Sequence, residues 1–287
     1  MTNKSPDSSD PTIDWESSQV AEQWSRNQAL RDESIGPATE MVLDLAGLEN
    51  GHRVLDLAAG TGGQTLLAAR RVGPSGYVLA TDLSDAMLNA AAEAAQRAGF
   101  ANIETRVMNT ERLDLDAESF DAVICRSALM LFSDPSKVLR EIHRVLKRGG
   151  KFAALVFSTE EKNPYQGIPF VIVRRLGGKS GPHFSLGNPQ RLRDIFRDGG
   201  FHDITVNTVS VPRHFASAAD AIRRLRDAIF LRQPMAKLRD REREQAWGEI
   251  EFQLRRLEGP SGVELPGEFS HRGRNQVGDF CDEGHLL

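Results

Sequence analysis

Residues 53–157 show two alternating patterns of apolar and polar positions. Short, nearly continuous apolar runs are each followed by a segment in which apolar residues recur every three or four positions, the spacing of a helix face. The short runs are predicted to be strands, at residues 53–57, 76–81, 103–107, 120–125 and 151–157. Strands that alternate with helices predict an α/β fold with a parallel sheet and right-handed crossovers.

Residues typical of helix ends support this division. Ser84 is expected to cap a helix that ends at Gly99, and Asp134 is expected to cap the helix after the fourth strand. The helix that Asp134 caps is expected to end in the cations and glycines of residues 147–150. Near the N-terminus, Pro37 is expected to open a helix, because proline favours the first helical position.

The pattern after residue 157 is less regular. A sixth strand is expected at about 204–211, and a seventh is expected to begin near Val263. Between them the sequence predicts two helices, one capped by Ser217 and one that runs from Pro234 to Leu257. The arginine-rich faces of these helices are expected to be solvated surface with salt-bridge partners, and recognition of an anionic substrate or of RNA is the alternative.

The turn after the first strand carries the clearest chemical signal. Asp56 closes the strand, and Gly60 and Gly62 leave backbone N–H groups bare, so that a ligand can lie against them. A nucleotide-type cofactor site is the leading interpretation, and an ordinary turn between a strand and a helix is the alternative. A dinucleotide fingerprint would need a third glycine at the position that Thr65 occupies.

A second carboxylate supports the cofactor interpretation. Asp82 ends the second strand, 22 positions after Gly60, and an acid about 20 residues past such a turn meets ribose hydroxyls in these folds. Met87, at the start of the next helix, is expected to pack either on an adenine face or in the core. Trp24, in the predicted N-terminal helix, is expected either to touch the cofactor or to pack between helices.

Three motifs resemble those of the class I S-adenosylmethionine-dependent methyltransferases. Residues 56–62 read Asp-x-Ala-x-Gly-x-Gly, like the first motif of that family. Residues 108–113 fill a slot in which the family commonly has Gly-Asp-Ala-Glu-x-Leu, and Asn109 replaces the acid that lies beside the adenine amino group. An amide oxygen can still accept that hydrogen bond. Residues 120–152 are similar to the ubiquinone/menaquinone-biosynthesis C-methyltransferase group, with Arg148 where that group usually has proline.

The resemblance implies the cofactor S-adenosylmethionine and a Rossmann-like α/β fold. Its sheet would have seven mostly parallel strands, the last of them antiparallel, with helical cap insertions. The residues that it places at the cofactor are Asp56, Ala58, Gly60, Thr61, Gly62, Thr65, Asp82, Leu83, Met87, Asn109, Thr110, Arg126 and Trp24.

The same resemblance suggests how the chain is organised. The expected parts are a disordered tail (1–12), a helical segment over the cofactor (13–50), the cofactor-binding core (51–157) and the C-terminal half of the sheet (158–287). An insertion in the last part, at about 215–258, is expected to roof the active site.

The expected reaction is methyl transfer to a small, largely apolar or aromatic metabolite, because residues 163–173 contain few charges. The resemblance favours C-methylation. O- or N-methylation of a secondary metabolite, and cofactor binding without methylation, stay open. A base is needed only if the acceptor must lose a proton, and the candidates are His183, His214 and Tyr165. A lone histidine is more often a surface or packing residue.

Composition agrees with a soluble enzyme. The 287 residues include 36 Lys and Arg against 40 Asp and Glu, a net charge of −4, so that no overall basic character predicts nucleic-acid binding. No run predicts a membrane span or secretion signal, no cluster has metal-ligand spacing, and a cytoplasmic location is expected. Two cysteines, Cys125 and Cys281, suggest no disulfide framework. A homodimer stays open.

Overall fold

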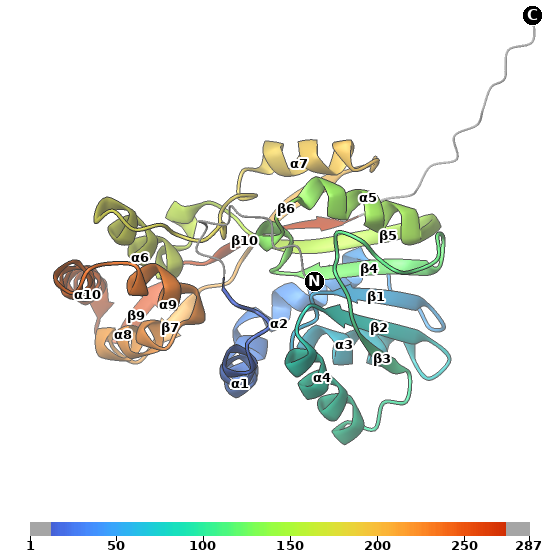
Figure 1. The fold of residues 1–287 in the computed structure, drawn as a ribbon, viewed down its shortest axis with the longest axis horizontal. Coiled ribbons are helices and arrows are strands. Elements are labelled where there is room, and N and C mark those ends of the chain that lie inside the picture. The colour runs from blue at the N-terminus through green and yellow to red at the C-terminus, as the bar shows by residue number, and fades with distance from the viewer. Residues whose placement is uncertain (1–12, 274–287) are drawn as a thin grey trace, which may run out of the picture. The chain divides into compact units, whose positions relative to one another are not determined.

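The computed structural model describes residues 13–273, which form two compact units (Figure 1). Among the described residues, the larger unit consists of 15–158, 184–209 and 269–273, and the smaller unit consists mainly of 159–183 and 210–268. The expected cap insertion at 215–258 belongs to the smaller unit, and its role as a cap stays a prediction. The expected disordered tail and Cys281 lie outside the described residues.

The larger unit is built on a sheet of seven strands in the order β3-β2-β1-β4-β5-β10-β6. β1 pairs in parallel with β2 and β4, whereas β10 pairs antiparallel with β5. The strands are β1 (Arg53–Leu57), β2 (Tyr77–Asp82), β3 (Ile103–Val107), β4 (Phe120–Arg126), β5 (Leu146–Phe157), β6 (Thr205–Ser210) and β10 (Glu268–Gly273). The predicted seven-stranded, mostly parallel sheet with an antiparallel last strand is confirmed.

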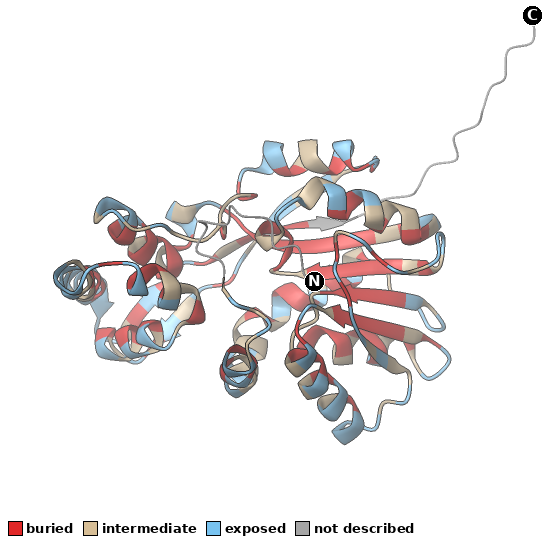
Figure 2. Cartoon of the chain, viewed as in Figure 1, coloured by how far each residue is buried: buried red, intermediate tan, exposed pale blue. Residues whose placement is uncertain are grey.

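Helices cover both faces of this sheet. In β1 the four residues 54–57 are all buried although successive side chains point to opposite faces, and the central strands are buried along most of their length (Figure 2). α3 (Gly63–Val72) and α4 (Asp85–Arg97) contact the half of the sheet formed by β1, β2 and β3. α2 (Gln28–Leu45) and α5 (Pro135–Val145) contact β5, α1 (Ser18–Arg26) contacts α4, and α7 (Pro189–Asp198) contacts α5.

The predicted helix caps in the larger unit are confirmed. The Ser84 hydroxyl accepts a hydrogen bond from the Met87 N–H, and the Asp134 carboxylate accepts one from the Lys137 N–H. Gly99 follows the end of α4 with a positive φ of 76°. Each cap satisfies backbone groups that the helix itself leaves unpaired.

Two predicted helix boundaries are wrong. Pro37 does not open a helix but lies inside α2, because Ile35, Ala38 and neighbouring residues on that helix are buried and their packing outweighs the break that proline causes. Residues 147–150 do not end a helix. They belong to β5, where Lys147 forms an ion pair with Asp121 at 2.7 Å (Nζ to Oδ1).

The smaller unit combines helices with a three-stranded sheet in the order β7-β9-β8. α6 and α8 both pack against α10. Its elements are α6 (Pro164–Arg175), β7 (Arg213–Phe215), α8 (Ala218–Arg226), α9 (Ile229–Ala236), α10 (Asp240–Arg256), β8 (Glu258–Gly259), β9 (Gly262–Leu265) and the 3-10 turn η2 (Glu160–Lys162). A second 3-10 turn, η1 (Leu129–Leu131), follows β4 in the larger unit.

The predictions for the smaller unit are confirmed in part. Ser217 caps α8 by accepting a hydrogen bond from the Asp220 N–H. The single predicted helix 234–257 is instead divided between α9 and α10, because the Glu242 carboxylate accepts from the Arg239 N–H and starts a new helix there. Val263 belongs to β9 of the small sheet, so the seventh strand of the large sheet begins later, at Glu268.

Candidate cofactor site

A strained turn joins β1 to α3. Ala58, Gly60 and Gly62 have positive φ angles of 52°, 56° and 84°, and the Gly62 N–H donates to the Ala59 carbonyl at 3.1 Å. A Cβ atom on Gly62 would lie 2.9 Å from the Cβ of Ala91, which is closer than packed carbon atoms approach one another. Both the backbone conformation and the proximity of α4 therefore require glycine at position 62.

Asp56 organises this turn from inside the protein. Its side chain is fully buried, and its two oxygens accept hydrogen bonds from Gln64 Nε2 at 2.8 Å and from the Thr65 hydroxyl at 2.7 Å. Burial raises the pKa of Asp56 to about 6, against the effect of these two hydrogen bonds. Asp56 thus fixes the first turn of α3 to the end of β1.

Asp82 joins the end of β2 to the glycine turn. Its Oδ2 accepts from the Gly60 N–H at 2.9 Å, and its Oδ1 accepts from the Ser84 N–H at 3.0 Å. Burial raises the pKa of Asp82 above its ordinary value. A carboxylate has about four lone-pair directions, so each oxygen can also accept a hydrogen bond from a ligand hydroxyl.

Apolar side chains lie exposed beside Asp82. Leu83 is 47% exposed, and Val107, whose strand position is paired with Asp82, is 52% exposed. The Asn109 side-chain oxygen accepts from the Glu111 N–H at 2.8 Å. An adenine ring that covered Leu83 and Val107 would remove both from water.

Two other predicted cofactor residues, Met87 and Thr110, are buried in the structure. Burial of Met87 agrees with the core-packing alternative. Contact of either residue with the cofactor stays a prediction.

The N-terminal helices lie over the glycine turn. Trp24 Nε1 is 3.1 Å from the position that a Cβ atom on Gly60 would take, and the Thr61 hydroxyl donates to the side-chain oxygen of Gln28. Gln28 Nε2 in turn donates to Asp32 at 2.6 Å. The turn is thus covered by side chains of α1 and α2, and the expectation that this segment also covers the cofactor stays a prediction.

Two arginines, Arg31 and Arg126, lie beside the turn. Arg126 Nη1 lies 3.4 Å from Asp32 Oδ1, and it donates to the Thr39 hydroxyl at 3.0 Å. Arg31 lies 4.0 Å above the Trp24 ring, and burial together with the charge of Arg126 lowers its pKa to about 10. Its Nε is buried and has no hydrogen-bond partner within residues 13–273. The two guanidinium groups add positive charge beside the turn, which suits an anionic group such as a carboxylate.

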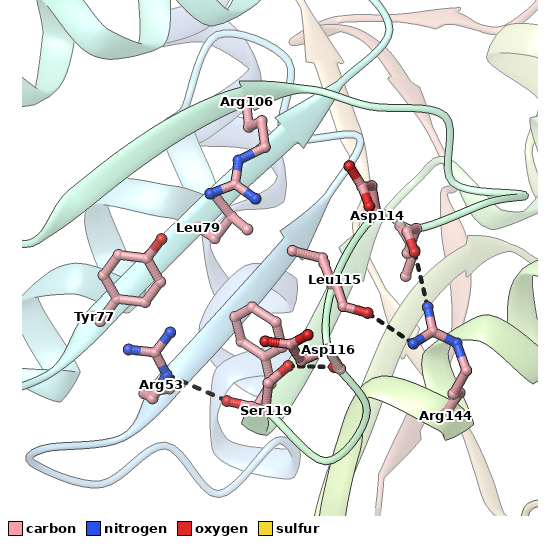
Figure 3. A pocket seen from close by; sticks show the side chains of 11 residues that line it. Arg53, Tyr77, Leu79, Arg106, Asp114, Leu115, Asp116, Ser119 and Arg144 are labelled. Carbon is pink, nitrogen blue, oxygen red and sulfur yellow. Dashed lines mark hydrogen bonds between the residues drawn. The ribbon is translucent and has the colours of Figure 1, made fainter.

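A hollow of about 470 Å³ lies elsewhere in the larger unit (Figure 3). It opens at the first residues of three strands, Arg53 of β1, Tyr77 of β2 and Phe120 of β4, whereas the glycine turn follows the last residue of β1. Residues 108–119, which connect β3 to β4, contain no helix, so this part of the sheet is covered by a loop. The hollow is therefore separate from the glycine turn.

The three candidate bases belong to the smaller unit. His183 is buried beside Phe170 and Phe230, with ring centroids 5.2 and 5.8 Å away, and burial lowers its pKa to about 4. Tyr165 stacks on Phe215 with centroids 5.2 Å apart, and burial raises its pKa to about 12. Near neutral pH, His183 is therefore an uncharged, weak base and Tyr165 is a protonated hydrogen-bond donor.

His214 differs from the other two candidates. Its side chain is 69% exposed, and its Nδ1 lies 3.5 Å from a carboxylate oxygen of Glu264. The catalytic role of all three residues stays a prediction.

Known proteins share this fold and these motifs. A family model described as a methyltransferase domain matches residues 48–176. The ubiquinone/menaquinone biosynthesis C-methyltransferase UbiE of Pasteurella multocida is 38% identical over 140 residues, which are 47% of this chain and 52% of that protein. UbiE of Cronobacter sakazakii is 36% identical over 178 residues, which are 56% of this chain and 71% of that protein. The chain belongs to the class I S-adenosylmethionine-dependent methyltransferases.

This membership identifies S-adenosylmethionine as the cofactor. The chain spans about half the length of the first of these relatives. The crystal structure of the YcgJ protein from Bacillus subtilis superimposes with a TM-score of 0.57 at 21% identity and covers 85% of this chain and 98% of that protein. At this identity the similarity shows the fold alone.

Several residues at the turn were not predicted from the sequence. The helix α2 precedes the glycine turn by some 30 residues in the sequence. Three of its side chains nevertheless lie at the turn or beside its neighbours, those of Gln28, Arg31 and Asp32. Only the spacing of Gln28 and Asp32, one helical turn apart, indicates that they share a face. Gln64 could have been found, because it directly precedes Thr65 in the first turn of α3.

No helix within residues 13–273 has both the length and the apolar composition needed to cross a membrane. In the same residues, no group of three His, Cys, Asp or Glu side chains is placed to hold a metal ion. Cys125 is a buried free thiol, and burial raises its pKa to about 12.

Proposed function

We propose that the protein transfers a methyl group from S-adenosylmethionine to a carbon atom of a small, largely apolar or aromatic metabolite. The names of the UbiE relatives support carbon as the methylated atom. Aromatic side chains of the smaller unit support an aromatic or apolar acceptor, since Tyr165, Phe170, Phe215 and Phe230 contact one another there.

The observation that carries the cofactor half of this proposal is the hydrogen bond from Gly60 to Asp82. It places a carboxylate, which can accept from ribose hydroxyls, against the glycine turn. Arg31 and Arg126 add positive charge for the carboxylate of the methionine end. Leu83 and Val107 offer apolar surface to the adenine.

The chemistry left to the protein is positioning and removal of a proton. S-adenosylmethionine supplies an activated methyl group, and the protein must hold the acceptor carbon in line with it and exclude water. An aromatic carbon that gains a methyl group must also lose a proton. His183 is uncharged at neutral pH and can accept one, although its low pKa makes it a weak base.

Transfer of an isotopic label tests the proposal. The protein is incubated with methyl-¹³C S-adenosylmethionine and a hydroquinone lacking a ring methyl group, and the product is examined by carbon NMR. A labelled methyl group bonded to ring carbon is expected, and it should form more slowly in Asp82→Ala at the same cofactor concentration. Label on oxygen would show O-methylation instead.

A binding measurement distinguishes a methyltransferase from a protein that binds the cofactor without methylating. Calorimetry with S-adenosylhomocysteine reports cofactor binding without any transfer. Binding without label transfer to the hydroquinone or to small molecules of a cell extract would indicate a cofactor-binding protein that does not methylate. Absence of binding would contradict the cofactor site itself.

A further inference from the structure

The smaller unit contains a hollow of about 210 Å³ beside α8, α9 and α10. Three arginines line it, Arg226, Arg232 and Arg243, together with the apolar or aromatic side chains of Leu231, Met235, Ala236 and Trp247. No acidic residue is part of this lining. The lining of the hollow therefore combines three guanidinium groups with apolar and aromatic side chains.

Arg226 differs from the other arginines of α8. Arg223 and Arg224 both form ion pairs with Asp220 on the same helix. Arg226 instead lies over the Trp247 ring, 4.5 Å from its centroid, and within residues 13–273 it has neither an ion pair nor a hydrogen-bond acceptor. Stacking on the indole holds the guanidinium plane and leaves its N–H edge available.

The charge at the hollow is only partly balanced. Arg243 forms an ion pair with Asp240, whose side chain is 94% exposed and lies outside the lining. A surface ion pair of this kind contributes little and exchanges readily with another anion. A ligand in the hollow would therefore meet the positive charge of Arg226, with which no carboxylate of residues 13–273 pairs.

Size and charge together restrict the ligand. A hollow of 210 Å³ is smaller than the roughly 300–1,000 Å³ of sites that enclose a whole drug-sized ligand, so it suits one part of a molecule. A carboxylate is satisfied by a single arginine fork, whereas the oxygens of a phosphate point in several directions and can accept from several arginines. We propose that this hollow binds the phosphate or diphosphate group of a small phosphorylated molecule, with the adjoining carbon atoms on Trp247 and Met235.

This proposal does not depend on the methyl-transfer function. It concerns residues of the smaller unit alone. It assigns a ligand to part of the arginine-rich helix faces, for which the sequence mainly predicts solvated surface. Arg226 is the residue on which it rests most directly, because its guanidinium has no anionic partner within residues 13–273.

Calorimetry on the full chain tests the proposal, with inorganic pyrophosphate as the probe and ionic strength held constant. Saturable one-to-one binding is expected. Arg226→Gln should weaken it at least about tenfold, the scale of losing a charge-assisted hydrogen bond. Arg223→Gln is the matched control, since it removes the same charge from the same helix outside the hollow, and it should change affinity less than about twofold.

A fluorescence measurement locates the probe. Pyrophosphate should change the tryptophan emission of the wild type, and Trp247→Phe should abolish that change while Trp15 and Trp24 remain. Far-UV circular dichroism and S-adenosylhomocysteine affinity verify that each variant is folded. If Arg226→Gln does not fold, Arg243→Gln takes its place with the same expected loss.

Three results would overturn the proposal. The first is no saturable pyrophosphate binding by the wild type. The second is an equal loss in Arg226→Gln and Arg223→Gln, which would mean a general charge effect. The third is far tighter binding of a single-stranded oligonucleotide with a steep salt dependence, which would indicate a nucleic-acid surface.

Discussion

The two units hold their charged side chains in different ways. In the larger unit, the buried Asp56 and the half-buried Asp82 accept hydrogen bonds that include one from the backbone of the glycine turn. In the smaller unit, several carboxylates pair with arginines three or four residues away on the same helix, as Asp220, Asp240 and Glu251 do. Long-range bonds fix one geometry, whereas local surface pairs tolerate change.

This difference matches where the family resemblance lies. The family model matches residues 48–176, which include the glycine turn, Asp82 and all of the central strands up to β5. The insertion of α8, α9 and α10 lies outside the match. The glycine turn and Asp82 therefore lie in the part of the chain that is shared with the family.

The largest predicted effect concerns the pH dependence of stability. Burial raises the pKa of Asp56 to about 6 from 3.8, so between these values the folded protein binds the proton more tightly than the unfolded chain does. The contribution of Asp56 to the free energy of unfolding is therefore greatest below about pH 4, and it is lost as the pH rises to about 6. Asp56→Asn removes this pH-dependent contribution, which is on the order of 3 kcal/mol.

Urea unfolding of both proteins from about pH 4 to pH 7 measures this difference. The stability of Asp56→Asn relative to the wild type should rise across the range. The variant can keep its contacts, because the Thr65 hydroxyl can accept a hydrogen bond from the new amide. Parallel profiles for the two proteins would show that Asp56 is not buried as a shifted acid.

The next prediction concerns cofactor affinity. Asp82→Ala should weaken S-adenosylhomocysteine binding by roughly 1.5–3 kcal/mol, the scale of hydrogen bonds to a charged group. Asp85→Ala is the control, because Asp85 is an exposed acid in the same segment that bonds only to Asn89. Calorimetry that gave the same affinity for the wild type and both variants would remove Asp82 from the site.

A pair of glycine variants separates backbone strain from close packing. Gly62 and Gly99 both have positive φ, 84° and 76°, but a Cβ atom on Gly99 would meet nothing within 4 Å. Gly62→Ala should lose about 1–2 kcal/mol more unfolding free energy than Gly99→Ala, the cost of the contact with Ala91. Equal losses in thermal unfolding would mean that α4 adjusts freely.

The smallest predicted effect lies in the smaller unit. Glu251→Ala removes an exposed ion pair with Arg255, four residues along α10. The midpoint of thermal unfolding should not change beyond measurement error, because such pairs are screened by water. A clear drop would show that the surface pairs of this unit carry more stability than their exposure indicates, and would weaken the contrast between the two units.

Features that depend on neighbouring residues could be predicted from the sequence. The glycine turn, the caps at Ser84 and Asp134 and the five strands up to residue 157 each follow from a short pattern, and all are present. The antiparallel last strand came from the family resemblance and not from any local pattern.

Features that depend on distant contacts could not be predicted. Pro37 sits within α2 because packing of that helix outweighs its local preference. The positions of β9 and β10 are set by the strands they pair with, β7 and β5, and no short pattern in the sequence identifies those partners. For the same reason, the contacts of Gln28 and Asp32 with the glycine turn could not be predicted from the sequence.

The place of β10 in the sheet has a consequence for synthesis. β6 is the outermost strand and is joined to the others only through β10, which is translated after both β5 and β6. A nascent chain on the ribosome therefore cannot complete its sheet until residues 268–273 have emerged. Until then the outer edge of β5 is open to strand addition from other chains, so a fragment ending before residue 268 should be prone to aggregate.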